Sequence, residues 1–118
     1  MAEVALVLLD PEGMIRYWSD GAEAMFGHRA VDVVGRRMDL FIPEELRIRH
    51  WIGWHRAWER GDIRENLVAM IPVLCQDGEV RRFAGRLLPV KGPHGELVAA
   101  MGVWTPASEH DAALYQLT

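Results

Sequence analysis

The chain has very little cysteine and no long apolar run. Cys75 is the single cysteine among 118 residues, so no internal disulfide can form and nothing favours an oxidising compartment. No apolar stretch approaches the roughly 20 residues that a membrane-spanning helix needs. The first residues also lack the charged and apolar regions of a signal peptide. We therefore expect a cytoplasmic protein with no membrane partner.

A surplus of positive charge is missing as well. Thirteen Lys and Arg face 17 Asp and Glu, which gives a net charge of −4 and leaves no broad basic surface for nucleic-acid phosphates. The sequence contains no P-loop, no G-x-S-x-G, no G-x-G-x-x-G after a strand and no close His/Cys cluster. We expect no nucleic-acid binding, no structural zinc site and no catalysis by protein side chains.

What is present is the composition of one globular domain. Half of the residues are apolar and a quarter are charged, and the length suits a single hydrophobic core. We expect this domain to cover residues 1–106. Residues 107–118 are then a tail, with a short terminal helix expected from Ser108 to Leu117.

The first half of the chain predicts two strands followed by helices. Residues 4–9 and 14–18 are apolar runs on either side of a turn that contains Pro and Gly. Ser19 or Asp20 can cap a short helix that ends at Gly27. A further helical turn follows at residues 30–34.

A longer helix is predicted from Pro43 to about Arg60. Proline is well tolerated in the first turn of a helix, and Glu44 and Glu45 suit the positive end of its dipole. Gly61 is the expected terminator.

The second half predicts three strands. Apolar runs at residues 67–74, 80–90 and 97–104 are joined by two turns that contain glycine. The predicted order is therefore two strands, several helices and a three-stranded meander.

Two segments resemble parts of a known family. The segment MIRYWSDGAEAMFGHRAVDVVGRRMDLFIPEE resembles the N-terminal half of PAS domains, and QDGEVRRFAGRLLPVKGPHGELVAAMGVW is similar to their closing hairpins. The resemblance covers nearly the whole chain. It implies an α+β fold in which a five-stranded antiparallel sheet carries helices on one face that enclose a ligand pocket.

A narrower resemblance concerns the ligand. The run P-E-E-L-R-I-R-H, which ends at His50, is similar to the helix of FixL-type haem oxygen sensors that carries the proximal iron ligand. It implies haem b as cofactor, His50 as the metal ligand, and Arg56 and Arg64 near the haem propionates. The distal Arg of those sensors falls on Ala69, so no donor to bound oxygen is evident. The N-C-R-F-L-Q-like motif of light-sensing flavin PAS domains is absent.

Helical spacing gives His50 a set of neighbours. His50, Gly53, Trp54 and Ala57 fall at i, i+3, i+4 and i+7, on one helical face. The two small residues would leave room for a planar macrocycle, with Trp54 as a wall. The alternative is that they let the helix approach the sheet closely, with His50 in an ordinary core.

An opposite wall is predicted on the strands. Gly85 interrupts its strand, and a strand glycine often marks close approach by a ligand. Phe83 and Leu87 share its predicted face and, with Leu67 and Met70, would form an apolar distal wall. A bulge or a packing requirement would explain Gly85 equally well. Met70 and Met38 are conceivable sixth iron ligands or simply core residues.

Partner contacts are expected at two places. Trp51 and Trp58 stand seven residues apart on the long helix, and aromatic residues are common in interfaces. The run V-A-L-V-L-L at residues 4–9 is apolar on both faces, which a homodimer or burial under the C-terminal segment would explain.

Three functions follow. The first is a haem-binding sensor that detects a diatomic gas or a redox change and signals through a dimer or a separate signalling partner. The second is a PAS module without haem that binds another small ligand or mediates dimerisation. The third is a haem enzyme with peroxidase-like activity, which an apolar distal wall disfavours because acid–base groups would be missing.

Overall fold

Short apolar runs that end at glycine turns form the strands of this chain. The computed structural model describes residues 4–63 and 68–106. In chain order the elements are β1 (Ala5–Leu9), β2 (Ile15–Trp18), α1 (Asp20–Phe26), α2 (Ala30–Val33), the 3₁₀ helices η1 (Met38–Phe41) and η2 (Glu44–Leu46), α3 (Arg47–Arg60), β3 (Ala69–Leu74), β4 (Val80–Lys91) and β5 (Leu97–Thr105).

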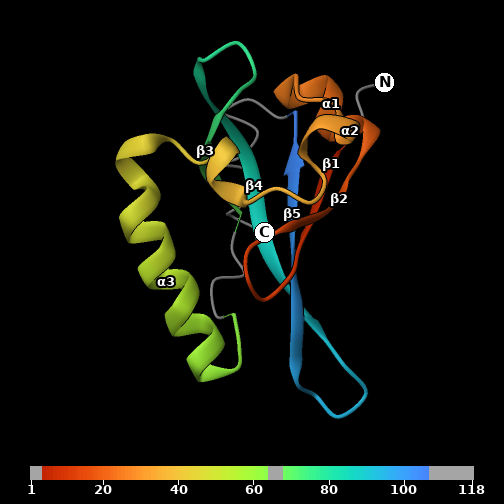
Figure 1. Cartoon of the computed structure of the whole chain (residues 1–118), viewed down its shortest axis with the longest axis vertical. Helices are drawn as coiled ribbons and strands as arrows, with labels where there is room; N and C mark the ends of the chain where they lie inside the picture. The colour runs from red at the N-terminus through yellow and green to blue at the C-terminus, as the bar shows by residue number, and fades with distance from the viewer. Residues whose placement is uncertain (1–3, 64–67, 107–118) are drawn as a thin grey trace.

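The strands form one antiparallel five-stranded sheet in the order β2-β1-β5-β4-β3 (Figure 1). Its register brings distant residues into one row: Val7 pairs with Trp18 and with Gly102, and Gly102 pairs with Leu87. Paired residues point to the same face of a sheet. Val7 and Trp18 in this row are buried, so the row belongs to the inner face, the one that the helices cover.

Aromatic residues from the helical segments fill that face. The ring centroid of Phe26, at the end of α1, lies 5.2 Å from that of Trp104 on β5, and Phe41 of η1 lies 6.2 Å from Trp104. Phe26, Phe41 and Trp104 are all buried. The predicted α+β architecture, with helices on one face of a five-stranded antiparallel sheet, is confirmed.

The predicted limits of α1 are confirmed by its capping groups. The hydroxyl of Ser19 accepts a hydrogen bond from the Ala22 amide, and Gly27 ends the helix in the left-handed conformation, with φ of 87°. Ser19 is buried and its hydroxyl also accepts from the Leu6 amide at 2.9 Å. One side chain thus caps the helix and ties it to β1.

The predicted helix at residues 43–60 begins differently. Pro43 precedes a 3₁₀ turn in which the Leu46 amide donates to the Pro43 carbonyl at 2.9 Å, and the α-helix starts only at Arg47. The 3₁₀ helix η1 was not predicted. Gly61 ends α3 in the left-handed conformation, as expected.

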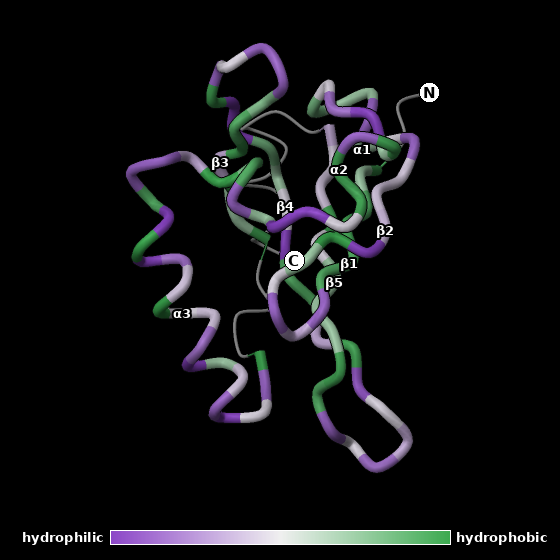
Figure 2. The backbone as a smooth tube through the Cα atoms, in the orientation of Figure 1, coloured by the Kyte–Doolittle hydropathy of each residue, from purple (hydrophilic) through white to green (hydrophobic). Residues whose placement is uncertain are grey.

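Helix α3 lies along the left side of the sheet in Figure 1, while α1 and α2 lie at its upper right. Figure 2 shows green, hydrophobic segments along β1 and β5 and a mixture of purple and green along α3. Trp54 is buried on this helix, whereas Ile48 is 78% exposed. No helix among the described residues is long and apolar enough to cross a membrane. The terminal helix predicted from Ser108 to Leu117 lies outside the described residues.

Candidate functional site

A cavity of about 270 Å³ lies between the inner face of the sheet and the segment from η1 to the first half of α3. Most of its lining is apolar, with His50 and Arg86 as the polar exceptions. The lining residues are Leu9, Phe41, Ile42, Pro43, Leu46, His50, Trp54, Ile71, Pro72, Arg86, Leu87, Gly102 and Trp104. We call this cavity the inner pocket.

Helix α3 brings His50 and Trp54 to the inner pocket because they stand one helical turn apart. Their rings stack, with centroids 6.2 Å apart and an interplanar angle of 22°. The indole N–H of Trp54 donates to the Pro11 carbonyl at 2.9 Å, which anchors the middle of α3 to the turn between β1 and β2.

The surroundings of His50 favour the neutral form of its imidazole. Burial lowers the pKa of His50 below the ordinary value of 6.5, and the charge of Asp39 only partly opposes this effect. Its Nδ1 atom is buried and has no hydrogen-bond partner among the described residues. An unpaired buried nitrogen costs free energy, so the site favours a ligand that would pair with it.

The indole of Trp104 lies across two glycines of the sheet. A Cβ atom on Gly85 would stand 2.6 Å from Cδ1 of Trp104, and one on Gly102 would stand 2.5 Å from its Cζ3. Gly85 is the register partner of Trp104 on β4. The close approach that we predicted at Gly85 is thus made by a side chain of this chain, and this corresponds to the packing alternative.

Trp104 also presents a polar atom. Its Nε1 is buried and has no hydrogen-bond partner among the residues that the structure describes. Trp104 on the sheet side and His50 on the helix side of the inner pocket therefore each have a buried nitrogen without a hydrogen-bond partner among the described residues.

The predicted helical residues divide into two groups. His50 and Trp54 line the inner pocket, and Ala57 packs against the hydrophobic core. Gly53 and Arg56 are exposed and do not line it; a Cβ on Gly53 would meet nothing within 4 Å. The predicted floor at Gly53 is therefore not part of this cavity.

On the sheet, Leu87 lines the inner pocket, whereas Met70, Phe83 and Gly85 of the predicted wall do not. Ile71 pairs with Phe83 and Met70 with Ala84, so Met70 points to the opposite face and Ile71 lines the pocket instead. Phe83 packs against Phe26, with ring centroids 5.4 Å apart. Arg64 and Leu67 lie outside the described residues.

Sequence reasoning did not identify Trp104, Phe41 or Gly102 as pocket residues. A usable signal was available, because Gly85 and Gly102 lie in adjacent predicted strands with Trp104 two residues after Gly102. Two strand glycines beside a bulky aromatic residue indicate that a ring covers them.

Two observations disfavour a haem in the inner pocket. A haem is larger than a cavity of about 270 Å³, and the Trp104 indole covers the glycines over which a flat ligand could lie. Met38, a conceivable iron ligand, is fully buried in the core. No group of three or more His, Cys, Asp or Glu that could hold a metal ion occurs among the described residues.

Solved structures of similar shape share the fold. A PAS domain of a protein from Colwellia psychrerythraea matches with a TM-score of 0.73 and 20% identity over 90% of this chain and 87% of that one. A light-oxygen-voltage domain solved with a flavin analogue matches with a TM-score of 0.71 and 21% identity over 97% and 84% of the two chains. The PAS-B domain of Drosophila melanogaster Cycle, with bound ethylene glycol, matches with a TM-score of 0.67 and 11% identity over 86% and 97%.

Sequence comparison points the same way as the fold. No curated protein matches the chain significantly. The family model described as the PAS fold matches residues 2–112, which is nearly the whole chain. The chain therefore belongs to the family of PAS-fold domains.

Proposed function

We propose that this PAS domain is a sensor module that binds a small, largely apolar organic molecule in the inner pocket, without haem. Domains of this family are generally sensory modules rather than enzymes. The observation that carries the proposal is that two residues lining a mainly apolar cavity, His50 and Trp104, each have a buried and unpaired nitrogen, Nδ1 and Nε1 respectively.

The size of the cavity supports a small ligand. Binding pockets for organic molecules usually measure roughly 300–1,000 Å³ and are mainly apolar with a few polar groups. The inner pocket, at about 270 Å³, is slightly smaller than that range. A single aromatic or alicyclic ring with a short substituent is the size of ligand that we expect.

The nitrogens of His50 and Trp104 determine which polar substituent the ligand should carry. Burial lowers the pKa of His50 and so favours its neutral form, whose Nδ1 accepts a hydrogen bond in the tautomer protonated at Nε2, whereas the indole of Trp104 can only donate one. A hydroxyl or amide group supplies both a donor and an acceptor. We therefore propose small phenols and carboxamides as the ligand class.

Haem ligated by His50 is the second candidate. The observation in its favour is that a neutral imidazole on a rigid helix lines the inner pocket. The small cavity and the position of Trp104 on Gly85 weaken it. The peroxidase-like haem enzyme shares these difficulties, and the homodimer stays a prediction.

The proposal is tested by titrating the protein with phenol, benzamide and benzene, using the intrinsic tryptophan fluorescence as readout. Phenol and benzamide should saturate, and benzene, which cannot pair with His50 or Trp104, should bind at least about tenfold more weakly because the buried polar atoms stay unpaired. Equal affinities for phenol and benzene would contradict the proposed role of the two polar atoms.

Two variants of the same helix sharpen the test. His50→Leu removes the acceptor and should weaken phenol but not benzene, whereas His55→Leu changes an exposed residue and should change neither. Incubation with haemin gives the alternative its own readout. A sharp Soret band that is lost in His50→Leu and kept in His55→Leu would replace the proposal with the haem sensor.

A further inference from the structure

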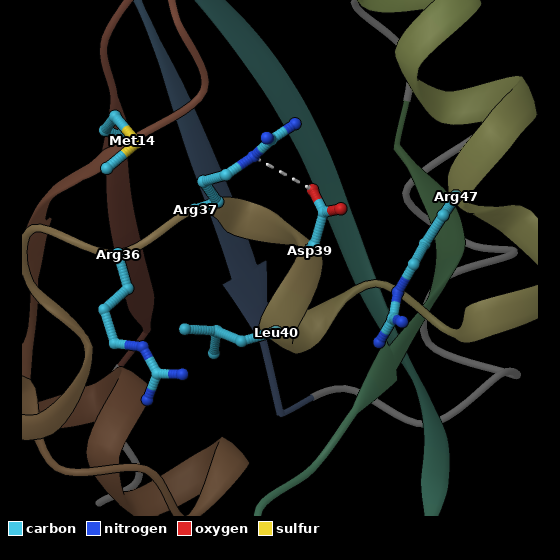
Figure 3. A pocket seen from close by; sticks show the side chains of 6 residues that line it. All are labelled: Met14, Arg36, Arg37, Asp39, Leu40 and Arg47. Carbon is cyan, nitrogen blue, oxygen red and sulfur yellow. Dashed lines mark ion pairs between the residues drawn. The ribbon is translucent and has the colours of Figure 1, made fainter.

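A second hollow, of about 480 Å³, opens on the outer side of the segment that covers the inner pocket. We call it the outer hollow. It is lined by Met14, Arg36, Arg37, Asp39, Leu40 and Arg47, none of which lines the inner pocket (Figure 3). It is therefore a separate site.

The outer hollow is cationic in an acidic protein. Three arginines and one aspartate contribute a charge of about +2, although the whole chain carries −4. Like charges brought together are unfavourable unless something offsets them. This local excess therefore favours an anion.

The backbone that carries Arg36 and Arg37 is fixed to β2. The Arg36 carbonyl accepts from the Ile15 amide at 2.8 Å, and Arg37 forms an isolated β-bridge with Met14. These bonds fix the backbone positions from which the two exposed arginine side chains extend.

The single carboxylate of the outer hollow is already occupied. Asp39 accepts from the indole N–H of Trp51 at 2.8 Å and lies 4.0 Å from Nε of Arg37. The Arg37 guanidinium also lies over the Trp51 ring, 4.7 Å from its centroid. These three side chains pair with one another, so Asp39 does little to neutralise the other two arginines.

Arg36 and Arg47 form no ion pair with any described residue. Nε of Arg47 donates to the Ile42 carbonyl at 3.1 Å, which orients the side chain and leaves its two terminal nitrogens for a ligand. Figure 3 shows the side chain of Leu40 between those of Arg36 and Arg47. The hollow thus combines two available guanidinium groups with an apolar surface.

We propose that the outer hollow binds a small organic phosphate, with the phosphate group paired with arginines of the hollow and the apolar part against Leu40 and Met14. Guanidinium groups pair with phosphate oxygens through two parallel hydrogen bonds, which a spherical anion cannot use. The concave shape, open to solvent and within the size range of ligand pockets, suits a small molecule better than an extended macromolecule.

The test is isothermal titration with phenyl phosphate, inorganic phosphate and an oligoglutamate peptide at one low ionic strength. Phenyl phosphate should bind one to one, and at least about fivefold more tightly than inorganic phosphate because of the apolar surface. Absence of saturation would overturn the proposal. Tighter binding of the peptide than of phenyl phosphate would overturn it in favour of an acidic protein partner.

Matched double variants distinguish binding in the outer hollow from a nonspecific effect of the net charge. Arg36→Gln/Arg47→Gln should weaken phenyl phosphate at least tenfold, whereas Arg60→Gln/Arg82→Gln, which makes the same change in net charge at exposed positions elsewhere, should not. Equal losses in both would overturn the proposal. If the first double variant does not fold, Arg36→Glu at an exposed position replaces it, and wild-type affinity in that variant would overturn the proposal.

A last variant tests whether the inner pocket and the outer hollow bind their ligands independently. Leu87→Trp fills the inner pocket from the sheet side and should abolish phenol binding while phenyl phosphate still binds. Loss of phenyl phosphate binding in this folded variant would contradict the assignment to the outer hollow.

Discussion

Trp104 and Gly85 face each other across β5 and β4 so closely that a single methyl group would not fit between them. A Cβ on Gly85 would lie 2.6 Å from Cδ1 and 3.0 Å from Nε1 of the indole. The ring of Trp104 therefore determines both what the sheet tolerates at position 85 and how much volume the inner pocket leaves for a ligand.

Gly85→Ala should destabilise the fold by about 1–3 kcal/mol because the added methyl overpacks the contact with Trp104. Trp104→Ala alone should cost about 3–5 kcal/mol. In the Trp104→Ala background the methyl at position 85 has space, so the cost of Gly85→Ala should nearly vanish. Urea unfolding of the four proteins gives the coupling free energy.

Gly53→Ala is the matched control for that substitution. Nothing lies within 4 Å of a Cβ at position 53, which is exposed in α3, so the change should stabilise by about 0.5–1 kcal/mol through helix propensity. Destabilisation by Gly53→Ala similar to that by Gly85→Ala would contradict the described packing.

The stability of the domain should fall as the pH drops below 6.5. Burial lowers the pKa values of His50 and His28 in the folded protein below the ordinary 6.5, while the unfolded chain keeps the ordinary value. Below pH 6.5 the unfolded state binds protons that the folded state resists, so the free energy of unfolding decreases until the pH reaches the folded pKa values; above 6.5 it is flat.

His50→Leu should make that dependence shallower by removing one of the two histidines. Urea unfolding at pH 5, 6 and 7 measures the slope. His55→Leu, at an exposed position of the same helix, should keep the wild-type slope. An unchanged slope in His50→Leu would mean that this imidazole is not buried as described.

Asp39→Ala should loosen the start of α3. The carboxylate of Asp39 accepts from the Trp51 indole at 2.8 Å, and its loss leaves that N–H without its partner, at a cost of about 1–2 kcal/mol. Asp39→Asn keeps an acceptor oxygen and should recover most of the loss. Amide hydrogen exchange of residues in α3 reports the effect locally. Equal protection of these amides in the wild type, Asp39→Ala and Asp39→Asn would contradict the role of the Asp39 carboxylate.

Ser19→Ala should cost about 1–3 kcal/mol, more than an ordinary helix cap. Its buried hydroxyl accepts from both Ala22 and Leu6, so the substitution unpairs two amides in two different elements. Asp20→Ala, at the exposed next position, is the control and should change the free energy of unfolding by less than about 0.5 kcal/mol. Thermal unfolding of both variants distinguishes them.

The features that sequence predicted well depend on nearby residues. Ser19, Gly27 and Gly61 act within one or two turns of their own helix, so their capping roles could be deduced from spacing. His50 and Trp54 share a face because of helical periodicity alone, and both line the inner pocket.

The features that were missed depend on register between strands. Ile71 rather than Met70 lines the inner pocket because it pairs with Phe83, and one residue of shift reverses every side chain of a strand. Trp104 reaches Gly85 only through the pairing of β4 with β5. No local pattern determines either register.

The 3₁₀ turn that precedes α3 could not be predicted from neighbouring residues either. Proline and two glutamates after it suit the first turn of an α-helix and of a 3₁₀ helix equally. Arg47 is held by the Ile42 carbonyl at 3.1 Å, a contact with the preceding segment that the spacing of residues does not reveal.

The central claim is that a small polar-tipped ligand pairs with the unpaired indole N–H of Trp104 in the inner pocket. The most direct measurement is the set of indole N–H signals in a ¹H–¹⁵N spectrum during titration with phenol, with the Trp104 signal assigned by Trp104→Phe. The account predicts a saturable downfield shift of the Trp104 signal that exceeds the shifts of the other tryptophans and is reduced in His50→Leu. A Trp104 signal that does not move while phenol binds would contradict it.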